Sequence, residues 1–296
     1  MNEKYILALG FFDGVHMGHQ ALLEACRELA QLHNGKPGAV TFGSHPDGVV
    51  RGNAPGLINT LADRERLLRS GGMERIIVLP FDRKTRQQPW QEFLGMLEET
   101  YHAAGFVCGS DFRFGHRGEG NREKLQQYCA EKGLPCAVVP QQQLEGVAVS
   151  STHIRNLMET GHMSQAIRFL GHPHILSGKV VHGHQLGRTL GIPTANLMLP
   201  KELVVPMFGV YACVAVVDGV RHPAVTNIGT RPTVAGIGIT VEPWILDFNG
   251  DLYGREIVLE FYQFLRPEQR FSSLDAMREE IFRNAAEARE ILKSHL

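Results

Sequence analysis

The chain has 296 residues, enough for two domains, and its 43% hydrophobic and 21% charged residues are an ordinary balance for a globular protein. Lysines and arginines are spread along the chain, whose formal net charge is −1, so no basic block predicts a nucleic-acid groove. The 5 cysteines show no CxxC spacing and predict neither a disulfide framework nor a zinc site.

These features predict a cytoplasmic protein, because unpaired cysteines fit a reducing compartment. The N-terminus lacks the apolar core of a signal peptide. No apolar run reaches the roughly 18 residues of a membrane span, so no membrane partner is expected.

The first half of the chain alternates short apolar runs with helical patterns. The apolar runs are Tyr5–Leu9, Ala39–Phe42, Ile76–Leu79, Phe106–Cys108 and Ala137–Val139, and the helical stretches lie near 18–33, 61–70, 87–102 and 121–132. This alternation predicts a doubly wound parallel sheet with helices on both faces. Ligands of such sheets bind beyond the carboxyl ends of the strands, so the residues that follow each strand are the candidates for a site.

The stretch from Gly10 to His19 joins the first predicted strand to the first predicted helix. A helix N-terminus offers unpaired N–H groups and a positive dipole end, both of which suit phosphate. His16 and His19 share a face on a helical first turn and can donate hydrogen bonds to phosphate oxygens as charge develops there. The alternative is that the two histidines only cap the helix. The HxGH arrangement resembles the signature of nucleotidyltransferases that transfer AMP from ATP.

Polar residues follow other predicted strands as well. Ser150, Ser151 and Thr152 can cap a helix that starts near Ile154, and Arg155 adds a bidentate phosphate donor in its first turn. Capping and phosphate binding are compatible, and we expect both.

Asp111 and Arg113 follow the fourth predicted strand. They form either an ordinary turn with a surface ion pair or contacts with a planar, partly charged ligand. The glycines and two phenylalanines beside them keep the second interpretation open.

Residues 152–170 are predicted as two short helices separated by Gly161, and the pattern changes after them. Strands are predicted at Ile175–Val181, Val210–Val217, Ala224–Asn227, Ile239–Phe248 and Ile257–Phe264. Asp218-Gly219 and Asn249-Gly250 are strong hairpin signals, so this region should be an antiparallel barrel or sandwich. We therefore expect one domain over 1–171 and a second over 172–296.

The tail from Ser272 is predicted to be helical, with Ser272 and Asp275 as a start that resembles a capping box. One apolar stripe runs along it, and we expect this stripe to pack against the barrel rather than to bind a partner. Its members are Leu274, Met277, Ile281, Ala285, Ala288 and Leu292.

A second glycine-rich stretch opens the predicted barrel, with glycines at Gly178, Gly183, Gly187 and Gly191. Glycines let backbone N–H groups approach phosphates closely, although a glycine-rich barrel corner is the plainer explanation.

Thr194 and Asn196 fall on the same face of an extended segment. Their hydroxyl and amide oxygens are hard ligands suited to Mg²⁺. Glu242 lies in an otherwise mostly apolar strand, where a lone carboxylate is either solvent-facing or a general base.

Several motifs together resemble the bifunctional riboflavin kinase/FAD synthetases, which make FMN from riboflavin and ATP and then FAD from FMN and ATP. The adenylyltransferase half is matched by Gly-x-Phe-Asp-Gly-Val-His-x-Gly-His-Gln, Asp-Phe-Arg-Phe-Gly and Ser-Ser-Thr-x-Ile-Arg. The kinase half is matched by Leu-Gly-x-Pro-Thr-Ala-Asn, Thr-Asn-Ile-Gly-Thr-Arg-Pro-Thr and Asp-Leu-Tyr-Gly. The resemblance spans residues 5–290. It implies a nucleotidyltransferase-like parallel sheet followed by an antiparallel barrel with a C-terminal helix.

The resemblance also implies roles for residues. His16 and His19 would stabilise the transferring α-phosphate, Glu242 would take the proton of the attacking ribityl hydroxyl, and Thr194 with Asn196 would hold Mg²⁺. Residues implied to bind nucleotide are Gly10, Phe12, Asp13, Gly14, Gly18, Ser150, Ser151, Thr152, Arg155, Gly178, Gly183, Gly187, Arg188 and Gly191. Residues implied to lie near flavin are Asp111, Arg113, Phe114 and Asn227.

The chain departs from the family pattern at Gly43 and Ser44, at Leu186, and at Pro243 and Trp244. Two other functions therefore stay open. One is a single-activity riboflavin kinase whose first half only binds nucleotide, and the other is a non-catalytic protein that binds or senses flavin. In each case the expected ligands are small molecules, namely riboflavin, FMN and ATP.

Overall fold

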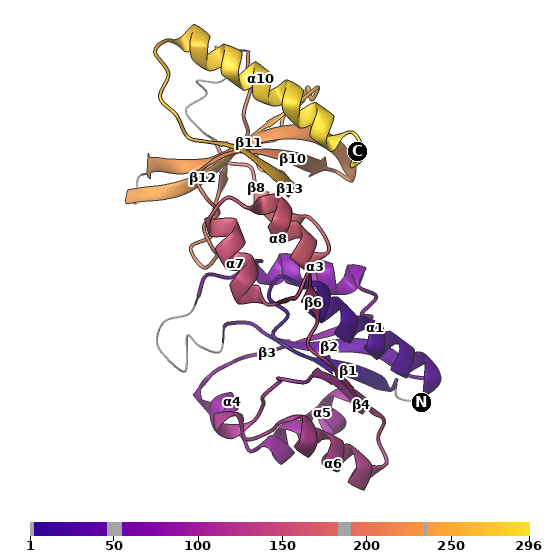
Figure 1. Cartoon of the computed structure of the whole chain (residues 1–296). Helices are drawn as coiled ribbons and strands as arrows, with labels where there is room; N and C mark the ends of the chain where they lie inside the picture. The colour runs from indigo at the N-terminus through magenta and orange to yellow at the C-terminus, as the bar shows by residue number, and fades with distance from the viewer. Residues whose placement is uncertain (1–2, 46–54, 183–190, 234–235) are drawn as a thin grey trace. The chain divides into compact units, whose positions relative to one another are not determined.

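The computed structural model describes residues 3–45, 55–182, 191–233 and 236–296 (Figure 1). Contacts between Cα atoms divide the chain into two compact units. The first contains Met1–Leu57 and Leu61–Ser151, and the second contains Ile58–Thr60 and Thr152–Leu296. Residues 152–171 thus cluster with the second unit. The domain boundary expected after residue 171 stays a prediction, because compactness alone does not show which segment folds independently.

The first unit is built on a five-stranded parallel sheet in the order β3-β2-β1-β4-β5. Its strands are β1 (Tyr5–Leu9), β2 (Lys36–Phe42), β3 (Arg75–Leu79), β4 (Ala103–Gly109) and β5 (Cys136–Val139). The chain winds outward from the central β1 in both directions, as a doubly wound sheet does. All five predicted strands are confirmed.

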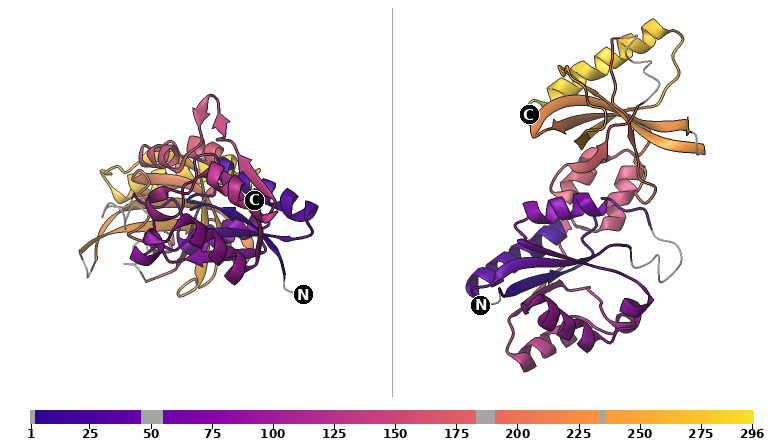
Figure 2. Two further views of the ribbon diagram at one scale, coloured as in Figure 1. Left: turned by 90° about the horizontal axis from the view of Figure 1, so that it is seen from below. Right: turned by 180° about the vertical axis from the view of Figure 1, so that it is seen from behind.

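Helices cover both faces of this sheet (Figure 2). They are α1 (Met17–Leu32) and α3 (Leu61–Ser70) on one face, and α5 (Trp90–Tyr101) and α6 (Arg122–Lys132) on the other. Successive strand residues point to opposite faces. In β1, Ile6 and Ala8 therefore pack with α1 and α3, whereas Leu7 and Leu9 pack with α5 and α6. The strand is buried on both faces, which explains its continuous apolar run.

The helix predicted near 87–102 is confirmed as α5, and a short helix that was not predicted, α4 (Arg83–Gln87), precedes it. The break between the two helices falls at Gln88 and Pro89, because a residue before proline is disfavoured in the helical region and Gln88 is extended at φ −67° and ψ 125°. Three further short elements of the first unit were not predicted. They are the 3₁₀ turn η1 (His116–Gly118) and the hairpin of β6 (Gln143–Leu144) and β7 (Val147–Ala148).

The second unit begins with α7 (Ser151–Glu159), of which only Ser151 belongs to the first unit, and α8 (Met163–Leu170), on either side of Gly161 as expected. A six-stranded antiparallel sheet follows in the order β8-β13-β10-β11-β12-β9. Its strands are β8 (His174–Lys179), β9 (Leu197–Met198), β10 (Gly209–Val217), β11 (Val220–Thr233), β12 (Gly236–Ile245) and β13 (Glu256–Pro267). The two end strands also contact each other, so the sheet forms a nearly closed barrel, as predicted.

One of the two predicted hairpin turns is confirmed. Asp218 and Gly219 join β10 to β11, with Val217 paired to Val220. The prediction for Asn249-Gly250 was wrong, because β12 does not pair with β13. β10 and β11 lie between these two strands, and residues 246–255 form a longer connection instead.

The C-terminal helix α10 (Leu274–Leu292) packs on β10 and β11. Its N-cap is Ser273, whose hydroxyl accepts a hydrogen bond from the N–H of Ala276 at 3.1 Å, so the start predicted at Ser272 with Asp275 was wrong by one residue. The C-terminal half of the predicted stripe lies in the core, at Ala285, Ala288 and Leu292. Leu274, at the other end, is exposed.

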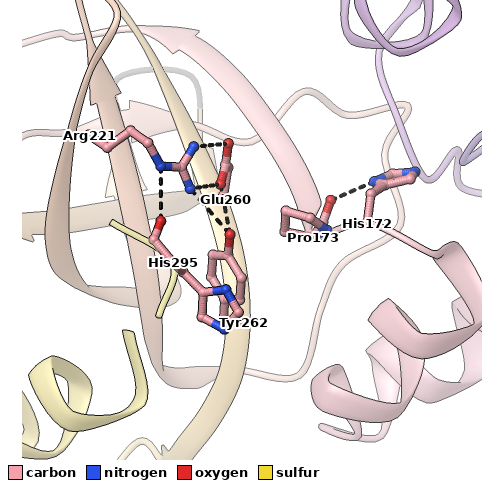
Figure 3. A network of polar contacts seen from close by, with 6 residues as sticks. All are labelled: His172, Pro173, Arg221, Glu260, Tyr262 and His295. Atoms are coloured by element: carbon pink, nitrogen blue, oxygen red, sulfur yellow. Dashed lines mark hydrogen bonds and ion pairs between the residues drawn. The ribbon is translucent and has the colours of Figure 1, made fainter. Parts of the chain in front are cut away.

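A polar network fastens the end of the chain to the barrel (Figure 3). Arg221 of β11 donates two hydrogen bonds to the carboxylate of Glu260 on β13, at 3.0 and 2.7 Å, and a third to the carbonyl of His295 at 2.9 Å. The ring of His295 stacks on Tyr262, with 4.3 Å between centroids. A bidentate arginine–carboxylate pair fixes geometry as well as charge, so this network anchors the residues that follow α10.

Candidate functional site

The turn after β1 has an unusual backbone. Phe12 lies at φ 59°, Gly14 at φ 83° and Val15 at φ 40°, all in the left-handed region. Phe12 is fully buried, and a Cβ at Gly10 would lie 3.0 Å from its ring, so a side chain at residue 10 would displace it. Non-glycine residues keep such conformations only where the surroundings over-determine them. The backbone conformation of the predicted phosphate-binding turn is therefore fixed by the packing around Phe12.

The two histidines stand at the start of α1. His16 is the N-cap, and its Nδ1 accepts a hydrogen bond from the backbone N–H of His19 at 3.3 Å. The two rings stack with 3.6 Å between centroids. Gly18 leaves room for this arrangement, since a Cβ there would lie 3.2 Å from the His16 ring. A neutral His16 then carries its proton on Nε2 and can donate from that atom.

His19 is held neutral by its surroundings. Burial lowers the pKa of its imidazole well below the ordinary value, and the nearby charges of His16 and Arg64 lower it further. Its Nδ1 is buried and has no hydrogen-bond partner among the described residues. A neutral ring at a helix N-terminus can donate a hydrogen bond without the repulsion that two adjacent imidazolium ions would create.

Asp13 and Ser151 tie a distant segment to this turn. The hydroxyl of Ser151, the first residue of α7, donates to the backbone carbonyl of Asp13 at 2.9 Å. Ser150, beside it, is half-buried, and Asp13 is buried. Thr152 and Arg155 belong to the second compact unit, so their approach to the histidines stays a prediction.

The segment after β4 places its candidate residues in different environments. Asp111 and Arg113 are exposed, whereas Phe114 is buried in the core beside α5 and α6. The Phe114 ring lies 5.8 Å from the ring of Phe93 and 6.5 Å from that of Trp90. The roles of the three residues near flavin stay predictions.

Arg64 is a buried residue of this region that the sequence did not single out. It comes from α3, and its Nη1 donates to the carbonyl of Phe11 at 3.1 Å and to the carbonyl of Phe42 at 2.9 Å. In the sequence it lies within Leu61-Ala-Asp-Arg-Glu-Arg-Leu-Leu68, where charged residues are normally solvent-exposed. No local signal distinguishes it from Arg66 on the same helix.

Two cavities lined by described residues of the second unit meet at Thr194. The larger, of about 420 Å³, is lined by Val180, Gly191, Pro193, Thr194, Ala195, Asn196, Pro243, Ile245 and residues 248–253. The smaller, of about 360 Å³, is lined by Ile192, Thr194, Val210, Val225, Asn227, Glu242, Trp244, Arg266, Glu268, Gln269, Phe271, Met277, Ile281 and Asn284. Thr194 lines both, so the two cavities adjoin at this residue.

Glu242 faces the smaller cavity from the middle of β12. Its carboxylate accepts a hydrogen bond from the hydroxyl of Thr240 at 2.9 Å, and in the sheet it pairs with Asn227 of β11. Trp244 follows on the same face, so one strand supplies both a carboxylate and an aromatic wall. Glu242 is half-buried, so its side chain is only partly screened from the cavity that it lines.

The predicted magnesium residues fit a hard cation. Thr194 and Asn196 both line the larger cavity, one side chain apart in an extended segment, and Asp251 lines it as well. Mg²⁺ takes few protein ligands and completes its shell with phosphate and water. Within the described ranges no group of three or more His, Cys, Asp or Glu could hold a metal ion.

The predicted glycines of the second unit have different positions. Gly191, at φ 72°, lines the larger cavity, whereas Gly178 pairs with Ile257 inside the sheet. Gly183, Gly187 and Arg188 lie outside the described residues, as does Leu186. Of the other departures from the family pattern, Gly43 and Ser44 are exposed after β2.

The wall of the smaller cavity holds a polar network that the sequence did not reveal. Nε of Arg266 donates to the side-chain carbonyl of Asn284 at 2.9 Å, and the amide of Asn284 donates to Glu280 at 3.2 Å. Burial lowers the pKa of the Arg266 guanidinium, and Glu280 counteracts this effect. Arg266 and Asn284 are 18 residues apart and come from β13 and α10, so only the folded chain brings them together.

Comparison with known families matches both halves of the chain. A model described as FAD synthetase matches residues 1–153, and one described as riboflavin kinase matches residues 170–292. The fold, the sites and these matches define an enzyme with a nucleotidyltransferase-like domain and a flavokinase barrel. No helix in the described parts of the chain is long and apolar enough to cross a membrane.

Known proteins resemble the chain over almost its full length. The bifunctional riboflavin kinase/FMN adenylyltransferase of Escherichia coli (strain K12) is 38% identical over 97% of this chain and 93% of that protein. The protein of the same name from Pseudomonas fluorescens is 38% identical over 96% of this chain and 92% of that protein. The chain therefore belongs to the family of bifunctional riboflavin kinase/FMN adenylyltransferases.

A solved structure shares the architecture. It is titled a macrolide-efflux protein from Streptococcus pneumoniae, is 29% identical, and superposes with a TM-score of 0.87 over 98% of this chain and 95% of that one. The agreement extends over both units of the fold.

Proposed function

We propose that the barrel unit transfers the γ-phosphate of ATP to riboflavin, and that the first unit transfers AMP from a second ATP to the resulting FMN. The observation that carries the kinase half is the pair of cavities that share Thr194. A transfer between two substrates needs two pockets that meet where the reacting atoms approach within about 3–3.5 Å of each other.

The smaller cavity suits the flavin. Its lining includes Trp244, Phe271, Met277 and Ile281, which give a planar ring system an apolar and aromatic environment. Glu242 lies in the same cavity and would take the proton from the ribityl hydroxyl as its oxygen attacks the γ-phosphorus. ADP leaves from the other side of that phosphorus. Asn227, opposite Glu242 in the sheet, would orient the ribityl chain.

The larger cavity suits the nucleotide. Gly191 brings backbone close to its interior, and Thr194 and Asn196 would hold Mg²⁺ together with phosphate oxygens. The metal ion would neutralise charge that develops on the phosphates. Thr194 lines both this cavity and the one that Glu242 lines, so the transferred phosphoryl group would pass beside Thr194.

In the first unit, a phosphate oxygen of FMN would attack the α-phosphorus of ATP, and pyrophosphate would leave. His16 and His19 would donate hydrogen bonds to the α-phosphate as its charge rises, because both stand at the N-terminus of α1. The hydroxyl of Ser151 would hold the turn in place through the carbonyl of Asp13. Phosphates of ATP would lie against the turn between Gly10 and His16.

One experiment tests both halves of the proposal. The protein is incubated with riboflavin, ATP and MgCl₂, and riboflavin, FMN and FAD are separated by chromatography. We expect FMN to appear first and FAD to follow, with neither formed when EDTA is added. FMN without FAD would identify a single-activity kinase, and release of neither product would identify a protein that only binds flavin.

A further inference from the structure

Arg64 is a charged side chain in an apolar place. It is 0% exposed, and among the fully buried side chains of the described residues it is the largest. Taking a guanidinium out of water is costly unless hydrogen bonds replace its hydration, and such a residue is weak evidence for stability. The burial of Arg64 is therefore not explained by a gain in stability, and its contacts indicate what else the side chain does.

The contacts of Arg64 converge on one point of the fold. Its Nη1 donates to the carbonyl of Phe11 at 3.1 Å, to the hydroxyl of Thr41 at 3.1 Å and to the carbonyl of Phe42 at 2.9 Å. Its guanidinium lies over the Phe11 ring, 4.2 Å from the centroid. Thr41 itself donates to the carbonyl of Phe11 at 2.8 Å. Arg64 thus joins the carboxyl ends of β1 and β2, where a doubly wound sheet binds its ligand.

The clamp on Phe11 immediately precedes the strained part of the turn. Phe12 follows at φ 59°, and Asp13 is held by Ser151 from the other side. Two fixed points therefore flank a left-handed, non-glycine residue, which is the kind of support that such a conformation needs. His16 comes three residues after Asp13, so the position of the histidine pair depends on this support.

The other two nitrogens of the Arg64 guanidinium differ from Nη1 in their surroundings. Nε and Nη2 are buried and have no hydrogen-bond partner among the described residues. Burial lowers the pKa of the guanidinium, whereas the nearby carboxylates of Asp13 and Glu65 oppose that effect. Asp13 belongs to the same turn, so the cation also attracts the turn electrostatically. A neutral side chain of the same length would keep the packing but would lose both the bonds and this attraction.

We propose that Arg64 is a positioning residue for adenylyl transfer, which fixes the turn between β1 and α1 so that His16 and His19 meet the α-phosphate. The inference rests on the function proposed for the first unit. Because Arg64 is fully buried, it would act through the backbone of Phe11 and not by contact with the reacting atoms. Misplacement of a catalytic group by about 1 Å can cost about 10²-fold in rate. A positioning defect should lower kcat and leave the binding of FMN and ATP nearly unchanged.

The test compares Arg64→Met and Arg64→Lys with Arg69→Met, an exposed arginine of the same helix that serves as the control. For each protein, kcat and the KM values for FMN and ATP are measured for FAD formation. FMN formation from riboflavin in the same preparation reports whether the second unit is folded. Urea unfolding followed by the fluorescence of Trp90, which packs against the core of the first unit, reports whether the first unit is folded. We expect Arg64→Met to lose about 10²-fold in kcat with little change in KM. Arg64→Lys should recover part of the loss, because it keeps the charge, and Arg69→Met should behave as the wild type.

Three results would overturn the inference: a wild-type kcat in Arg64→Met, a defect confined to KM, or no recovery in Arg64→Lys. If Arg64→Met lacks the unfolding transition of the first unit it is misfolded, and Arg64→Lys then decides. A lowered kcat in that variant supports the inference, and a wild-type kcat overturns it. His19→Ala separates the two levels of the argument. Undiminished FAD formation in His19→Ala would refute the site itself, whereas a wild-type kcat in Arg64→Met would refute only the role of Arg64.

Discussion

The two candidate sites are built in opposite ways. In the first unit, a continuous stretch from Gly10 to His19 supplies the turn, the helix start and both histidines. In the second unit, Thr194, Asn227 and Glu242 come from three separate segments, and α10 closes the smaller cavity from far along the chain. A site of the first kind depends on local backbone conformation, whereas one of the second kind depends on the register of a whole barrel. Variants should therefore fail in different ways in the two units.

The largest effect is expected for Glu242→Gln. The amide keeps the shape of the carboxylate, including a carbonyl that can accept from Thr240, but it cannot take a proton. Loss of a general base typically costs about 10²–10⁴-fold, so FMN formation should collapse while supplied FMN is still adenylylated. Steady-state rates of both steps on one preparation measure this. A near-normal kinase rate would remove Glu242 from the mechanism.

His16→Ala and His19→Ala should have the opposite effect, with FAD formation lost and FMN formation retained. Loss of one donor to a transition state typically costs about 10²–10³-fold, so FAD formation should fall by that factor while FMN formation continues. The measurement is the same pair of rates. An equal loss of both activities would contradict the assignment of the histidines to the first unit alone.

The sequence predicted the fold class and local features well, but not which particular strands and side chains meet. The strand, turn and helix around His16 followed from the pattern of nearby residues, and so did the hairpin at Asp218-Gly219. The hairpin expected at Asn249-Gly250 is absent, because strand order is decided by which partners bury each strand and not by the turn alone.

The same limit explains the residues that were missed in each site. Arg64 and the Arg266–Asn284 pair have no motif, since Arg64 reaches Phe42 across 22 residues of the chain and Arg266 reaches Asn284 across 18. The Arg64 side chain makes sense only after β1 and β2 are placed side by side. Charged residues on an amphipathic helix are otherwise expected in water.

A third prediction concerns where the second unit begins. Helix α8 contacts β13 and β8, and Ile167 packs against the core cluster that α10 covers. A fragment of Thr152–Leu296 should therefore be more stable than one of His172–Leu296, by several times the roughly 1.5–3 kcal/mol of a single buried apolar side chain. Urea unfolding of the two fragments, followed by the fluorescence of Trp244, compares them. Equal midpoints would favour a boundary at 171 and 172.

The smallest effect is expected for the pH dependence of stability, in which the buried histidines of the two units differ. In the first unit they stand at the proposed site, whereas in the second unit His174 is buried in β8, 5.5 Å from the ring of Phe261, with no hydrogen-bond partner for its Nδ1 among the described residues. Burial lowers the pKa of His174 to about 3, and the neighbouring His172 adds to this effect. Between that value and the ordinary pKa of about 6.5, the unfolded chain binds the proton and the folded chain does not. Stability must therefore fall as the pH drops through this range.

At pH 5 the loss from this one residue is about 2 kcal/mol, because each pH unit below about 6.5 costs about 1.4 kcal/mol. Phenylalanine has a similar ring and cannot be protonated, so His174→Phe should lose that part of the acid sensitivity while it matches the wild type more closely at pH 8. Urea unfolding at both pH values, followed by Trp244 fluorescence in a Trp90→Phe background, isolates the second unit, because the chain has 2 tryptophans. The same decrease in stability between pH 8 and pH 5 in both proteins would show that His174 does not carry the pH dependence. The acid sensitivity of the barrel would then have to come from its carboxylates, such as Glu260 in its bonds with Arg221.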